Sequence, residues 1–168
     1  MKQPNLLENA KYQLNLVISF ISMIDGRAAV VLGLNIGLLG ILALNFTSID
    51  FIYIWPVIFP VITLTLSVMS LYHIYKCFYP QLSGGDKSIV YFKEVANRTK
   101  NTFITEFKDI SNKDYAEEIL AQTWRNSQIV KAKFEHLKSA FIYLLVNLVP
   151  ALVSLVFLGI ENKQFIVK

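Results

Sequence analysis

The sequence has little charge for its length and a single cysteine. Only 17% of its 168 residues are Asp, Glu, Lys or Arg, below the quarter found in average soluble domains. Its mean hydropathy of +0.47 favours a membrane protein. Cys77 has no second cysteine to pair with, so we interpret it as an ordinary residue near a membrane boundary. The length predicts one domain, residues 1–168.

The sequence also lacks the motifs of enzyme active sites and metal centres. It has no phosphate-binding loop of the Gly-x-x-x-x-Gly-Lys type and no nucleophile elbow. His73 and His136 are far apart and have no neighbours at metal-ligand spacing. The stretch "SGGD" at 83–86 favours an ordinary turn over a phosphate site. We therefore expect no catalytic residues, no metal and no cofactor.

Three segments have no charged residue and are long enough to cross a bilayer as helices: 28–46, 51–75 and 139–159. The N-terminal residues lack the apolar stretch and cleavage site of a signal peptide. We predict an all-α, multi-pass membrane protein with three transmembrane helices. Helix extensions and residues 76–138 would form a small helical bundle outside the membrane.

Basic residues indicate the orientation. Residues 76–138 hold eleven of the sixteen Lys and Arg residues, and the segment through Arg27 holds three more. Basic residues near span ends favour the cytoplasmic side, so we expect the N-terminus and residues 76–138 to be cytoplasmic. The hairpin at 47–50 and the C-terminal tail would then lie outside. This bias explains the net charge of +4 without a nucleic-acid partner.

Apolar residues at helical spacing continue outside the spans. One helix is predicted from Ile89, after a break at Pro80 and Gly84-Gly85. A second is predicted to begin at Ser111, which together with Asp114 three residues later resembles a capping box. The second helix runs into the third span, and the N-terminal helix runs into the first. We favour packing of these extensions on each other over a helix lying flat on the lipid. The predicted stripes are Leu6, Leu7, Ala10, Leu14, Val17, Ile18 and Ile21, and Leu120, Trp124, Ser127, Val130, Phe134, Leu137 and Phe141.

Within the spans, the conspicuous polar residues are Asn35, Asn147 and Ser154. An intramembrane Asn can donate hydrogen bonds across helices. Gly33, Gly37 and Gly40 form a small-residue face suited to close helix contact, within a protomer or between protomers. We therefore expect helix packing at these residues and a homo-oligomer in the lipid bilayer. No span holds a charge, which argues against a proton relay or coupled transporter.

Two opposite charges, Asp25 and Arg27, stand directly before the first span. Two residues apart on a helix, they do not share a face, so each is free to meet a different partner. Lys131 or Lys133 would suit Asp25, and a phosphate would suit Arg27. We favour structural pairing between helices over ligand contact.

The chain resembles the transmembrane effectors of Pycsar anti-phage systems over nearly its whole length. In "IDGRAAVVLGLN", Asp25 and Ala28 match an Ala-Asp-x-Lys-Ala-type motif, with Arg27 in place of Lys, Ile24 in place of Ala, and Gly26 inside the motif. The segments "KCFYPQL" and "IVYFKEVA" match the end of the two-span hairpin and the aromatic-rich entry to the cytoplasmic helices. In "SQIVKAKFEHLKSAF", Ser127 and Lys133 match a Ser-then-Lys pattern before the last span.

The resemblance implies an effector of the bacterial inner membrane. Family members are partnered with a pyrimidine nucleotide cyclase that produces cyclic UMP or cyclic CMP on infection. The effector responds by impairing the membrane, so that the infected cell stops supporting phage. Related effectors occur beside cyclic-oligonucleotide synthases, which leaves the nucleotide open. The alternative is a structural, accessory or holin-like membrane protein without a nucleotide ligand.

A cyclic nucleotide carries one negative phosphate, for which Arg27, Lys131 and Lys133 are the candidates. Tyr91 or Trp124 could stack on the base, although we expect Trp124 to pack in the core. Ordinary solvated charge is the competing explanation for the basic run Arg125, Lys131, Lys133 and Lys138. The predicted ligand-binding residues are Asp25, Arg27, Tyr91, Ser127, Lys131 and Lys133.

Overall fold

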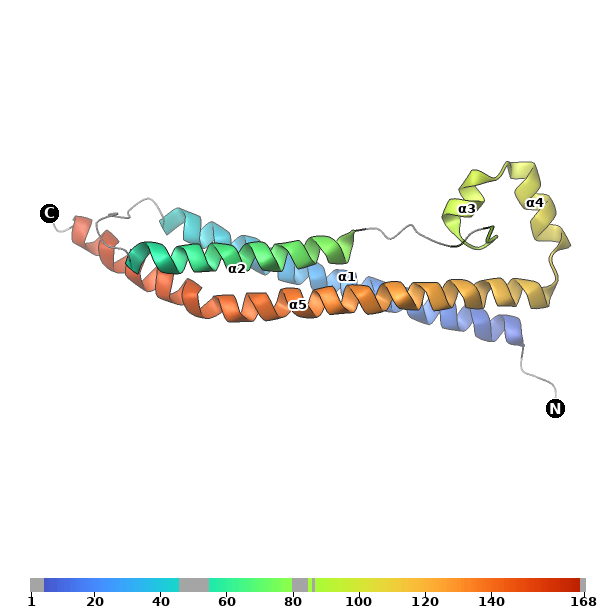
Figure 1. Cartoon of the computed structure of the whole chain (residues 1–168), viewed down its shortest axis with the longest axis horizontal. Helices are drawn as coiled ribbons and strands as arrows, with labels where there is room; N and C mark the ends of the chain where they lie inside the picture. Colours follow the sequence, from blue (N-terminus) through green and yellow to red (C-terminus); the bar gives the residue numbers. More distant parts are fainter. Residues whose placement is uncertain (1–4, 46–54, 80–84, 86, 167–168) are drawn as a thin grey trace. The chain divides into compact units, whose positions relative to one another are not determined.

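The computed structural model describes residues 5–45, 55–79, 85 and 87–166, and all regular structure in these residues is helical (Figure 1). Three of the helices are long and apolar enough to cross a membrane. The predicted all-α, multi-pass class is therefore confirmed. The helices are α1 (Leu6–Asn45), α2 (Trp55–Phe78), α3 (Phe92–Asn97), α4 (Lys100–Asp109) and α5 (Asn112–Ile166).

The three predicted spans lie on α1, α2 and α5. The start of the second span and the hairpin at 47–50 fall outside the described residues, as do Phe46, Pro80 and Gly84. The predicted extensions are confirmed, because α1 begins at Leu6 and α5 begins at Asn112, and each continues without a break into its span. At the start of α5, Ser111 caps the helix as predicted, because its Oγ accepts from the Asp114 N–H at 3.1 Å. The Asp114 carboxylate accepts from the Ser111 hydroxyl at 2.7 Å.

The prediction of one helix from Ile89 is wrong, because α3 and α4 are separate. Between them, Arg98 and Thr99 have extended backbone, and the Thr99 hydroxyl accepts from the Thr102 N–H at 3.2 Å, which caps α4. Arg98 fixes the junction, since its guanidinium donates to Glu106 at 2.7 Å and to the backbone oxygens of residues 87 and 88. α3 therefore ends at Asn97 and α4 begins after the Thr99 cap, without any Gly or Pro at the junction.

The chain divides into two compact units. Unit 1 comprises residues 1–24 and 80–132, and unit 2 comprises residues 25–79 and 133–168. In unit 1, the start of α1 packs on the start of α5 around Ala10, Ala116 and Ile119, with partly buried side chains against this core. This confirms that the two extensions pack on each other. The small side chains of Ala10 and Ala116 allow the two backbones a close approach.

Most of the predicted apolar stripe on α5 lies outside the core. Trp124 is 68% exposed and Phe134 51% exposed, and Leu120 and Phe141 are exposed as well. The expectation that Trp124 packs in the core is therefore wrong for the single chain. Of the predicted stripe, Leu137 is buried. The other buried apolar residues of α5 are Ala116 and Ile119 in unit 1 and Ala140, Leu144 and Ala151 in unit 2. On the N-terminal stripe, Leu6 and Ile18 are likewise exposed.

Candidate functional site

An ion pair joins α1 to α5 in unit 2. Lys133 Nζ donates to Asp25 Oδ1 at 2.6 Å, and the Lys133 side chain is 13% exposed. Asp25 therefore pairs with a lysine of another helix, and it does so just before the charge-free segment 28–46 of its own helix. Lys131, the other cation considered for Asp25, is exposed.

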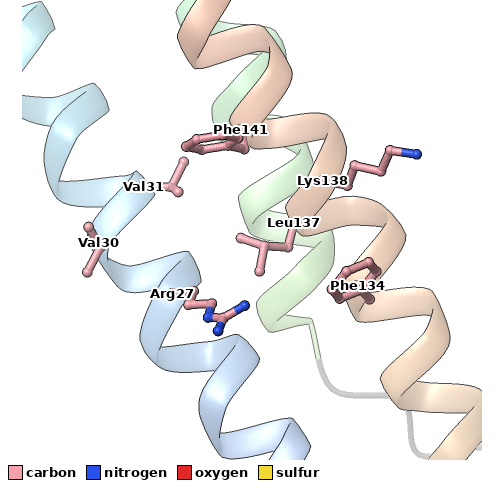
Figure 2. A pocket seen from close by; sticks show the side chains of 7 residues that line it. All are labelled: Arg27, Val30, Val31, Phe134, Leu137, Lys138 and Phe141. Atoms are coloured by element: carbon pink, nitrogen blue, oxygen red, sulfur yellow. The ribbon is translucent and has the colours of Figure 1, made fainter.

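Arg27 lies away from this ion pair. Its side chain reaches from α1 toward α5, where Val31, Leu137 and Phe141 face the space between the two helices (Figure 2). Within the described part of the chain, no hydrogen bond or ion pair engages Arg27. Arg27 and Lys138 are the two cations among the residues that line this groove.

The interior of unit 2 is polar where three helices meet. The Asn35 amide of α1 donates to Ser70 Oγ of α2 at 2.9 Å, and Ser70 Oγ donates to the Ala140 carbonyl of α5 at 2.9 Å. A second contact follows, in which the Asn147 amide donates to Ser67 Oγ at 2.8 Å. Asn35 and Asn147 are fully buried, so these bonds lie where lipid offers no substitute.

The three glycines of the first span lie on a face of α1 that takes no part in these contacts. A Cβ added at Gly33, Gly37 or Gly40 would meet nothing within 4 Å. No other described helix of the chain therefore packs closely against them. The contact expected at these glycines is not made within the protomer, and a contact between protomers stays a prediction.

In unit 1, Tyr91 is occupied by its neighbours. Tyr91 as a whole residue is 3% exposed, and the Arg125 guanidinium carbon lies 4.1 Å from the ring centroid. Arg125 also donates to the Tyr91 hydroxyl at 3.3 Å, and Phe92 packs edge-on at 5.0 Å between centroids. A nucleotide base would stack on Tyr91 only after Arg125 had moved.

Two other residues of unit 1 are accessible on one face of α5. Trp124 is 68% exposed, and Lys131 is exposed as well. Seven residues make nearly two helical turns, so the two side chains share a face and start about 10 Å apart along the axis. Ser127 lies between them, and its hydroxyl donates to the Thr123 carbonyl of its own helix at 2.9 Å.

The two histidines meet in unit 2, which the sequence did not predict. His73 Nδ1 and His136 Nδ1 are 3.1 Å apart, a hydrogen-bonding distance. His73 also stacks on Tyr143, with ring centroids 5.5 Å apart. Sixty-three residues separate the two histidines, and only the register of α2 against α5 brings them together.

The fold and these contacts define an all-α protein with three helices that can cross a membrane. A family model described as the Pycsar effector protein domain matches residues 9–160. Because this match covers most of the 168 residues, the chain belongs to the Pycsar effector family, as the resemblance predicted. It is a membrane effector of anti-phage defence whose family membership implies a cyclic nucleotide signal from a cyclase partner. The comparisons with curated proteins and with solved structures gave no match.

Proposed function

We propose that this effector binds a cyclic nucleotide, cyclic UMP or cyclic CMP in the first place, and then impairs the bacterial inner membrane. Family membership over residues 9–160 supports a nucleotide signal. The distribution of the basic residues supports a cytoplasmic location for the N-terminus and for residues 76–138. Unit 1 would then be accessible to a cytoplasmic nucleotide.

The observation that carries the proposal is the continuity of two helices. Both α1 and α5 run without a break from unit 1 into unit 2. A ligand that changes how the two helices pack in unit 1 would therefore act on two membrane helices. Such a ligand shifts the protein only by its difference in affinity for the two arrangements.

Within unit 1, the accessible face of α5 supports a nucleotide contact. Trp124 offers an exposed ring on which a base can stack, and Lys131 offers a cation for the phosphate. Of the residues predicted from sequence, Lys131 keeps its role in this proposal. Lys133 is engaged by Asp25, and Tyr91 is engaged by Arg125.

Tryptophan fluorescence tests this contact directly. The chain has two tryptophans, so Trp55→Phe leaves Trp124 as the sole reporter. Titration of the full-length protein in detergent with cyclic UMP or cyclic CMP should change Trp124 emission, whereas cyclic AMP should change it only at much higher concentration. A charge-assisted phosphate contact contributes about 1.5–3 kcal/mol, so Lys131→Ala should weaken binding at least tenfold.

The matched control is Lys113→Ala, another exposed lysine of α5, which is 3.9 Å from Glu117. It should leave nucleotide affinity unchanged. In cells, growth arrest by the wild type should require the nucleotide and fail in Lys131→Ala at equal membrane insertion. Arrest without any nucleotide would contradict the proposal and favour the holin-like alternative. Wild-type affinity in Lys131→Ala would remove this lysine from the site.

A further inference from the structure

A groove in unit 2 separates α1 from α5 where both helices enter their charge-free segments. Its volume is about 440 Å³, within the range of small-molecule sites. Its lining combines five apolar side chains, among them Val31, Leu137 and Phe141, with Arg27 and Lys138. Figure 2 shows the Arg27 guanidinium at the α5 side of α1, with Phe141 and Val31 beyond it along the helices.

The two cations mark the boundary between water and lipid. Arg27 is the last charged residue before the apolar run of α1, and Lys138 is the last before that of α5. Basic side chains at span ends reach the headgroup region. The apolar part of the groove therefore lies at the depth of lipid tails, and the guanidinium lies at the depth of lipid phosphates.

The charges of the groove have no acidic partner among the residues that the structure describes. No acidic residue lines it, and within the described part of the chain no carboxylate pairs with Arg27 or Lys138. The nearest acid in sequence, Asp25, is already bound by Lys133. An anion from outside the chain is the complementary partner.

From this arrangement we infer that the groove holds an anionic phospholipid of the bilayer leaflet on the Arg27 side. The phosphate contacts Arg27, and one acyl chain lies along Val31, Leu137 and Phe141. Lys138 also lines the groove, but its ammonium points away from Arg27 (Figure 2), so it adds positive potential near the headgroup rather than a contact to the same phosphate. Basic pockets between membrane helices bind anionic headgroups in this way. A cyclic nucleotide has no apolar tail for these walls, so the inference stands apart from the proposed nucleotide site.

Native mass spectrometry of the full chain in detergent tests the inference. Affinities are measured for phosphatidylglycerol, for phosphatidylcholine of the same acyl chains, and for inorganic phosphate alone. The wild type should bind one phosphatidylglycerol at least tenfold more tightly than phosphatidylcholine. Each cation near a lipid surface contributes about fivefold, so Arg27→Gln with Lys138→Gln should remove most of this preference.

Two controls separate the groove from general surface charge and from misfolding. Lys76→Gln removes an exposed cation where the second span ends, and it should leave the preference intact. Arg27→Lys should restore most of the binding lost in Arg27→Gln, which a misfolded variant would not do. Equal binding of the two lipids, unchanged preference in the double variant, or an equal loss in Lys76→Gln would overturn the inference. Inorganic phosphate binding as tightly as the lipid would also overturn it, by assigning the site to a free anion.

Discussion

The ion pair between Asp25 and Lys133 should contribute measurably to the stability of unit 2. It joins two membrane helices at 2.6 Å, with side-chain exposures of 36% for Asp25 and 13% for Lys133. At this distance, Coulomb's law gives about 1.6 kcal/mol at the dielectric constant of water and about 6 kcal/mol at an effective value of 20.

Desolvation offsets much of this attraction, because Lys133 is largely buried. Exposed ion pairs contribute about 0.2–1 kcal/mol, and breaking a fully buried pair costs about 3–5 kcal/mol. This pair lies between those cases, so we expect a coupling free energy of about 1–2 kcal/mol. Each single variant should cost more than the coupling itself, because it leaves the other charge without its partner.

A double-mutant cycle measures the coupling. Asp25→Ala, Lys133→Ala and the double variant would be unfolded in mixed detergent micelles, and the free energies of unfolding compared. Lys131→Ala is the matched control, since this exposed lysine two residues away should change the free energy by less than about 0.5 kcal/mol. A coupling below about 0.3 kcal/mol would refute the role assigned to the pair.

Three further variants test other contacts. Gly85→Ala should destabilise unit 1 by about 1–2 kcal/mol or more, because φ of Gly85 is +80° and the new Cβ would overlap the Tyr91 ring. Hydrogen exchange of the unit 1 amides measures this destabilisation. Gly40→Ala is the control, since its new Cβ would meet nothing within 4 Å, and it should leave the exchange unchanged. Asn35→Ala should lower the unfolding free energy by about 0.5–1.5 kcal/mol through its interhelical bond, and thermal unfolding unchanged from wild type would contradict that bond. Gly37→Leu should weaken self-association in crosslinking while leaving chain stability unchanged, and unaltered crosslinking would mean that this face contacts lipid.

The membrane helices could be predicted from sequence because a long charge-free run leaves the backbone few alternatives in lipid. The pairing of Asp25 was predictable for a related reason. An acid directly before a charge-free run finds its counter-charge near another span end, and Lys133 precedes the third span by six residues. The position of Asp25 at the end of a span therefore pointed to a lysine just before another span, and Lys131 and Lys133 were the two candidates.

The buried faces could not be predicted as well. The cytoplasmic part of α5 carries apolar residues beyond its packed face, among them Leu120, Trp124 and Phe134, so the apolar stripe alone did not give the direction of packing. The packed side of α5 is marked by Ala116 and Ala140 instead, because small side chains allow close approach. The break between α3 and α4 was missed because a single capping threonine, Thr99, resembles any helical surface residue.

The composition of the interior supports the proposed response of unit 2 to a small ligand. Its fully buried side chains include several polar ones, and the carbonyl oxygens of Asn35 and Asn147 have no hydrogen-bond partner within the described residues. Lipid removes the hydrophobic driving force between helices, and each interhelical hydrogen bond adds only about 0.6 kcal/mol on average. Moving a two-state equilibrium from 1:99 to 99:1 takes about 5.5 kcal/mol of differential binding. The helices of unit 2 are joined by a few such hydrogen bonds and one ion pair. Differential binding of this size is therefore enough to change how these helices pack, whereas it would not rearrange a tightly packed apolar core in water.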